Sequence, residues 1–136
     1  MTDMVETYRG TVYPWHCDFN GHMNVMYYAG KFDEATWHFL SQKGITRVYL
    51  SEHNRGMVAA EQNMKYYKEV FAGDLVFVRT ELLELKPKAI IFRHLMFNAE
   101  TNELVAEGRM VGIHLDMKSR KAVPFPDSLL AQLTQP

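Results

Sequence analysis

The spacing of the hydrophobic residues changes near residue 25, and this change restricts the fold more than any other feature of the sequence. Between residues 25 and 43 apolar side chains recur every three or four positions, as on one side of an α-helix. Asn24 can cap a helix start through its side-chain oxygen, and Gly44 is a typical helix stop. The pattern predicts one long amphipathic helix over residues 25–43. Its apolar face would carry Tyr28, Phe32, Ala35, Thr36, Phe39 and Leu40, and its water-facing side Lys31, Asp33, Glu34 and Gln42.

Strand-like alternation occupies most of the remaining chain. The expected strands cover residues 6–13, 57–68, 75–85, 89–97 and 104–115, and residues 128–133 are expected to form a short terminal helix. A mixed connection through residues 53–56 is expected to follow the helix. One long helix packed on an antiparallel sheet of about five strands is the simplest way to bury both apolar faces, so the predicted class is α+β. Residues 1–136 are predicted to form a single domain.

Composition excludes several classes of function. The net charge is −1 and the sequence pI is about 6.6, which favours neither nucleic acid nor an anionic membrane as a partner. Cys17 is the only cysteine, so an internal disulfide is impossible and a reducing compartment is expected. The chain shows no signal segment and no apolar run long enough to span a membrane. These features predict a cytoplasmic protein.

Reactive side chains gather in residues 15–28, at the start of the predicted helix. His16, Cys17, Asp18 and His22 lie within seven consecutive residues there. Their spacing fits no standard zinc pattern, so no metal and no cofactor are expected. Neighbouring side chains on an extended chain point apart, which argues against a Cys17–His16 dyad and favours an inert thiol. Asp18 is either a cap of the turn or helix, or a working carboxylate.

The run Asp18-x-x-Gly21-His22-x-Asn24-x-x-x-Tyr28 resembles the signature of hotdog-fold acyl-CoA thioesterases of the 4-hydroxybenzoyl-CoA thioesterase type. Tyr66 followed by Gly73-Asp74 resembles a second segment of that family, and the order of strands matches as well. The sequence departs from the family at Glu69, where many members have proline, and at Val25 and Met26, where more polar residues are common.

The resemblance implies a hotdog fold, an acyl-CoA substrate and assembly as a homodimer or homotetramer. The active site would lie at the subunit interface, with residues 56–63 of a second copy completing it.

Hydrolysis of a thioester requires a polarised carbonyl oxygen and a nucleophile at the carbonyl carbon. Unpaired amides at a helix N-terminus can polarise the oxygen, and the resemblance assigns this role to the amide of Val25. A carboxylate can attack directly or activate water, and Asp18 is the candidate for either role. The candidate substrate-binding residues are His22, Asn24, Tyr27 and Tyr28, of which His22 and Asn24 would also hold the loop and the helix start.

Two other functions stay open. A hotdog hydratase or dehydratase would need a histidine paired with a helix carboxylate, which the sequence does not indicate. A noncatalytic module would bind an acyl ligand without hydrolysing it. Two further hypotheses concern the ligand. Lys86 and Lys88 either form a solvated turn or meet the phosphates of coenzyme A. Five aromatic residues gather near the loop: Trp15, Tyr27, Tyr28, Phe32 and Trp37. The helical spacing of Tyr28 and Phe32 places these two in the core, whereas others could line an acyl pocket or form an aromatic cage for a quaternary ammonium acyl group, such as a betaine-like or carnitine-derived one.

Overall fold

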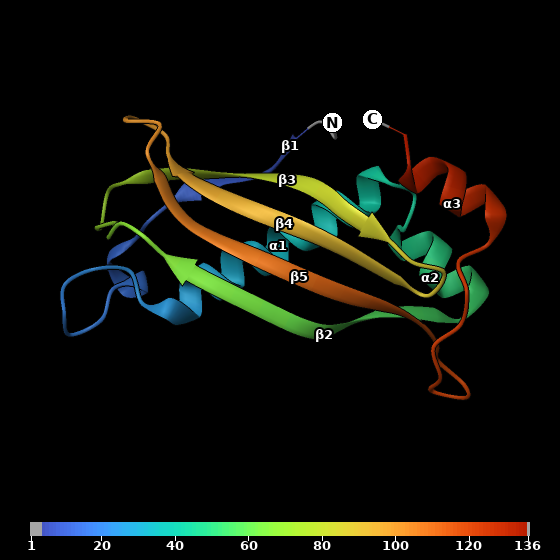
Figure 1. The fold of residues 1–136 in the computed structure, drawn as a ribbon. Coiled ribbons are helices and arrows are strands. Elements are labelled where there is room, and N and C mark those ends of the chain that lie inside the picture. Colours follow the sequence, from blue (N-terminus) through green and yellow to red (C-terminus); the bar gives the residue numbers. More distant parts are fainter. Residues whose placement is uncertain (1–3, 136) are drawn as a thin grey trace.

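A five-stranded antiparallel sheet curves around one long helix in the computed structural model, which describes residues 4–135 (Figure 1). The strand order is β1-β3-β4-β5-β2, so β1 and β2 form the two edges of the sheet. The strands are β1 (Val5–Thr11), β2 (Arg55–Tyr66), β3 (Leu75–Leu85), β4 (Ala89–Asn98) and β5 (Leu104–Asp116). The predicted α+β class is confirmed.

The long helix α1 (Val25–Gln42) begins and ends where the sequence predicts, to within one residue. The side-chain oxygen of Asn24 accepts a hydrogen bond from the amide of Met26 at 3.0 Å, and Gly44 follows the helix with a φ of +95°. The prediction that Lys31 faces water is wrong. Its side chain is 5% exposed, and its Nζ donates to the hydroxyl of Tyr8 at 2.9 Å and to the carbonyl of Thr11 at 3.3 Å. Lys31 therefore ties α1 to β1.

Three short helical segments complete the fold over residues 4–135. They are the 3-10 turn η1 (Pro14–His16), α2 (Arg47–His53) and α3 (Asp127–Leu133). The terminal helix was expected, whereas α2 lies in the connection predicted only as mixed. The Thr46 side chain caps α2 by accepting from the amide of Tyr49 at 3.1 Å, and Asn54 ends the helix in the left-handed conformation. Two turns are too few for a helical repeat to emerge in the sequence.

The predicted strands all form, and only their ends differ. The strand over residues 75–85 is β3 without a shift, whereas β2 begins and ends two residues earlier than predicted. β1 ends at Thr11. The next residue, Val12, is hydrogen-bonded to the β2–β3 connection, because its amide donates to the carbonyl of Asp74 at 2.8 Å.

A buried histidine joins α1 to the middle of the sheet. His94 on β4 is fully buried, and its two ring nitrogens contact the hydroxyls of Thr36 at 2.8 Å and Thr80 at 2.6 Å. The hydroxyl of Thr36 donates to the carbonyl of Phe32, so it accepts from Nε2–H of His94, and Nδ1 accepts from Thr80. Burial lowers the pKa of His94 to about 3, and this histidine is neutral in the folded chain.

Candidate active site

The loop between β1 and α1 is a miniature hairpin with Asp18 at its turn. Cys17 and Met23 pair as an antiparallel bridge, and the amide of Asp18 donates to the carbonyl of His22 at 3.1 Å. The amide of Gly21 closes the turn by donating to the carbonyl of Asp18 at 2.9 Å. Gly21 has a φ of +86°, a conformation that glycine adopts without a steric penalty. The turn therefore requires glycine at this position.

Two further backbone hydrogen bonds fasten the loop to its surroundings. The amide of Met23 donates to the carbonyl of Val70 on the β2–β3 connection at 2.9 Å. The amide of Asn24 donates to the carbonyl of His16 at the same distance. The loop is thus held on both sides, and Asp18 has little freedom to move relative to the start of α1.

The carboxylate of Asp18 accepts hydrogen bonds at both oxygens. The side-chain amide of Asn24 donates to Oδ2 at 2.9 Å, and the amide of Asn20 donates to Oδ1 at 2.8 Å. These two contacts, that of Asn24 first, hold the pKa of Asp18 below its ordinary value. Asp18 is therefore ionised at neutral pH, as both a nucleophile and a general base must be.

The first turn of α1 leaves one backbone donor free beside this carboxylate. The Asn24 side chain takes the amide of Met26, and the Asn24 carbonyl accepts from the amide of Tyr27 at 2.9 Å. Within residues 4–135 the amide of Val25 makes no hydrogen bond to another group. An unpaired N–H at the positive end of a helix dipole is suited to a developing negative charge on oxygen.

Asp18 and Val25 line the same cleft, which has a volume of about 460 Å³. The opposite wall comes from the end of β2 and the β2–β3 connection. Tyr28 lies between the two walls: its ring meets that of Tyr66 edge-on, and its hydroxyl donates to the carbonyl of Lys68 at 3.3 Å. Burial raises the pKa of Tyr28 to about 12. The lining residues are Asp18, Asn20, His22, Met23, Val25, Tyr28, Tyr66, Tyr67, Lys68 and Glu69.

The other candidate residues divide between the cleft and its support. His22 lines the cleft, with Nδ1 3.2 Å from the carbonyl of Met23 and Nε2 3.6 Å from a carboxylate oxygen of Glu69. Asn24 and Tyr27 do not line the cleft. The side-chain amide of Asn24 donates to the carboxylate of Asp18, and the ring of Tyr27 packs on that of His16 at a centroid distance of 4.6 Å.

His16 and Cys17 form no dyad. Nδ1 of His16 accepts from the amide of Tyr13 at 2.9 Å, and the Cys17 thiol lies 3.8 Å from the Tyr13 carbonyl. Sequence reasoning missed the wall formed by Tyr67, Lys68 and Glu69, although the family departure at Glu69 had marked that segment.

The aromatic residues near the loop do not come together as a cage. Tyr28 and Phe32 belong to the buried core, as their helical spacing predicts. Trp15 stacks on Tyr13 with ring centroids 4.6 Å apart, whereas Trp37 lines a different pocket further along α1. The cage hypothesis is therefore wrong in its geometry. The turn with Lys86 and Lys88 joins β3 to β4, at the end of the sheet opposite to the β1–α1 loop (Figure 1).

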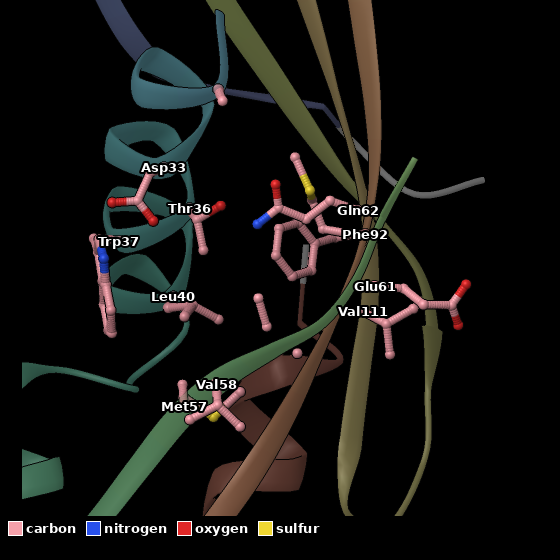
Figure 2. Close-up of a pocket in the computed structure, with 14 residues that line it drawn as sticks. Asp33, Thr36, Trp37, Leu40, Met57, Val58, Glu61, Gln62, Phe92 and Val111 are labelled. Atoms are coloured by element: carbon pink, nitrogen blue, oxygen red, sulfur yellow. The ribbon is translucent and has the colours of Figure 1, made fainter. Parts of the chain in front are cut away.

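The pocket that Trp37 lines is an opening of about 120 Å³ between α1 and the edge strand β2. Leu40, Phe92 and Met110 contribute apolar surface to it. Figure 2 shows Gln62 extending from β2 toward α1, with Asp33 on the helical side of the opening.

Among residues 4–135 no three His, Cys, Asp or Glu side chains are grouped as metal ligands. In the same part of the chain, no helix has the length and apolarity needed to cross a membrane.

Comparison with known proteins agrees with this fold. The family model of the thioesterase-like superfamily matches residues 12–133. Betainyl-CoA thioesterase of Pseudomonas aeruginosa is 24% identical over 133 residues, which cover 98% of this chain and 84% of the relative. The long-chain acyl-CoA thioesterase FadM of Escherichia coli is 24% identical over 121 residues, covering 89% of this chain and 91% of that protein.

Among solved structures, a hypothetical protein of Staphylococcus aureus in complex with CoA superposes with a TM-score of 0.89 at 17% identity. The match covers 98% of this chain and 83% of that one. The hotdog fold is therefore confirmed. The chain belongs to the thioesterase-like superfamily, and the predicted class of enzyme, an acyl-CoA thioester hydrolase, is confirmed at the level of the family.

Proposed function

We propose that this chain hydrolyses acyl-CoA thioesters with Asp18 as nucleophile or general base and the amide of Val25 as the carbonyl-polarising donor. One observation carries the proposal: an ionised carboxylate and an unpaired helix N-terminal amide line the same cleft. The two groups supply the two requirements of thioester hydrolysis, and the hydrogen bonds of the loop hold them in a fixed relation.

In the general-base route, Asp18 takes a proton from water while the water oxygen bonds to the thioester carbon. The carbonyl oxygen becomes negative and accepts from the Val25 amide. Collapse of this intermediate breaks the C–S bond, releasing the acid and the coenzyme A thiolate, which then takes up a proton. In the nucleophilic route, a carboxylate oxygen of Asp18 bonds to the same carbon, the thiolate leaves, and water hydrolyses the mixed anhydride. Both routes use the same two groups.

Two copies of the chain are proposed to complete the site. β2 is a sheet edge, and its backbone groups on the side away from β5 are free to pair within residues 4–135. By the family resemblance a homodimer or homotetramer forms, with residues 56–63 of a second copy beside the acyl group. Sedimentation velocity should give a mass of two or four chains. A monomer with full thioesterase activity would contradict this part of the proposal.

The decisive experiment follows thiol release from a panel of short, branched and long acyl-CoAs by wild type and Asp18→Asn. We expect kcat to fall roughly a hundredfold or more in Asp18→Asn. Asp127→Asn, the same change at the start of α3, is the matched control and should keep the wild-type rate. Equal hydrolysis of a good substrate by wild type and Asp18→Asn would refute the assignment. Binding of acyl-CoA without hydrolysis by wild type would favour the binding module.

The proximity of Glu69 to His22 gives the hydratase hypothesis one point of support, since a histidine does lie beside a carboxylate in this cleft. Glu69 stands on the β2–β3 connection, however, and not on a helix. Hydration of an enoyl-CoA, with loss of its conjugated absorbance and no release of thiol, would establish that alternative.

A further inference from the structure

The opening between α1 and β2 combines apolar surface with a single carboxylate from the helix. Leu40, Phe92 and Met110 form part of its lining, and Asp33 belongs to the same lining. Asp33 makes no ion pair within residues 4–135. The sequence pattern had placed this residue simply among those facing water. Its position beside an apolar pocket changes what it can do.

The charge of this pocket has one sign. None of the described residues that line it is Lys, Arg or His. The only other acid in the lining, Glu61, points away from α1 on the far side of the sheet (Figure 2). In the strand register it lies opposite Val111 of β5. Asp33 is therefore the one charged side chain on the helical side of the pocket. A cation entering it would meet a free carboxylate, and an anion would be repelled.

The pocket and the cleft that contains Asp18 are both lined by α1 and β2. Val25 and Tyr66 line the cleft, and Ala29, about one helical turn after Val25, lines the pocket together with Gln62 of β2. Asp33 is eight residues beyond Val25, which corresponds to about 12 Å of helix. An acyl group whose carbonyl sits at the Val25 amide would need several bonds before its far end came near Asp33.

The size of the pocket limits the group that fills it. A volume of about 120 Å³ is slightly smaller than a protein cavity of about 150 Å³ that binds benzene. A trimethylammonium head has fewer heavy atoms than benzene and fits such a space, whereas a long alkyl chain would extend beyond it.

We infer that the enzyme selects acyl groups that carry a cationic head a few carbons from the thioester carbonyl, with Asp33 as the specificity residue. This inference rests on the proposed function, because it concerns the acyl group hydrolysed at Asp18. The apolar lining receives the methyl groups, and the carboxylate of Asp33 neutralises the charge. Trp37, which also lines the pocket, adds an aromatic side chain of the kind that attracts such cations.

The test uses a pair of substrates that differ only in charge. In 4-(trimethylammonio)butanoyl-CoA the head is cationic, and in 5,5-dimethylhexanoyl-CoA a carbon atom replaces the nitrogen. For wild type we expect kcat/KM to be roughly tenfold higher for the cationic member, the effect of one close charge pair near a protein surface. Equal rates, or a preference for the neutral member, would overturn the inference without touching the proposed function. Failure of both thioesters and of the wider panel to release thiol would instead refute the proposed function.

Two variants locate the source of the preference. Asp33→Asn keeps the shape of the side chain and removes its charge, so the ratio of the two kcat/KM values should fall to about one. Glu34→Gln removes a charge from the next position of α1, which does not line this pocket, and it should keep the wild-type ratio. An unchanged ratio in Asp33→Asn, or a lost ratio in Glu34→Gln, would show that Asp33 does not select the substrate. The wild-type comparison decides the inference even if a variant fails to fold.

Discussion

Replacing Val25 with proline would remove one hydrogen atom that the proposed mechanism requires. Proline lacks a backbone N–H, so the change deletes the donor and leaves the rest of the loop in place. The first helical position tolerates proline well, because the N–H lost there has no partner within the helix. The residue before it must be extended, and Asn24 already has φ −73° and ψ 150°. The structure therefore predicts a folded protein.

The expected loss of rate follows from the role of the amide. Removal of one donor to a developing oxyanion lowers kcat about 100- to 1,000-fold, or roughly 3 to 4 kcal/mol of transition-state stabilisation. Because the Val25 amide makes no hydrogen bond within the described chain, thermal unfolding should shift little. Hydrolysis would be measured as kcat and KM on the best acyl-CoA, and folding as the melting temperature by circular dichroism.

Val25→Ala is the matched control, since it loses the same apolar side chain and keeps the N–H. We expect it to retain kcat within a few fold, because the Val25 side chain is 56% exposed and supports little packing. If Val25→Pro is folded and hydrolyses its substrate as fast as Val25→Ala, the amide is not the donor, and the carbonyl must be polarised elsewhere.

Three further predictions follow from the loop and the core. In Asn24→Ala, loss of the cap should lower stability by about 1 kcal/mol, or 3 to 4 °C in Tm for a chain of this length; Asn24→Ser should keep the cap. Both variants lose the contact that most lowers the pKa of Asp18, so the acid limb of the pH profile of kcat/KM should move to higher pH in each. An acid limb at the wild-type pH in Asn24→Ser would contradict this. The pKa of His94 is about 3 in the folded chain and has its ordinary value of 6.5 in the unfolded chain, so only the unfolded chain takes up a proton between these values. The contribution of His94 to stability is complete above pH 6.5 and is lost as the pH falls below 6.5, by about 1.4 kcal/mol per pH unit. Urea titrations at several pH values should show a smaller loss of stability per pH unit in His94→Gln than in wild type. Gly21→Ala should lower stability by about 1 kcal/mol, because φ is +86° although no atom crowds the new methyl, and should also lower kcat. Gly30→Ala is equally uncrowded but helical and should raise stability, so a stabilised Gly21→Ala or a destabilised Gly30→Ala in thermal melts would refute the conformational argument.

The long helix could be predicted closely because its signals are local. Nearly five turns of apolar periodicity lie between a capping residue, Asn24, and a stop residue, Gly44, and each signal indicates the same boundaries. The seven-residue α2 offers only its cap, Thr46, and a pattern too short to separate from a loop. Lys31 was misplaced for another reason. Its burial depends on a hydroxyl supplied by Tyr8, on a strand that pairs far away in the chain, and no repeat within the helix could indicate it.

The candidate site was predicted unevenly. Asp18, His22 and Val25 lie within one short segment with a family motif, and the structure brings them to a single cleft. The opposing wall, including Glu69, depends on how the β2–β3 connection folds back over the loop, which is a long-range property. Asp33 was missed because a pattern only separates apolar from polar positions. Its pocket exists because β2 lies beside β5 at the sheet edge rather than beside its neighbour in sequence, β3.

The hairpin that carries Asp18 is closed by hydrogen bonds of its own and of its immediate neighbours, and none of these bonds involves the residues that line the pocket near Asp33. The two proposals therefore assign rate and selectivity to separate parts of the sequence. On these proposals, substitutions on the middle of α1 and on β2 would change the acyl group that the chain accepts, without rebuilding the groups proposed to break the thioester. The same separation makes those positions the natural targets for redesign toward a chosen thioester, with the loop left as it is.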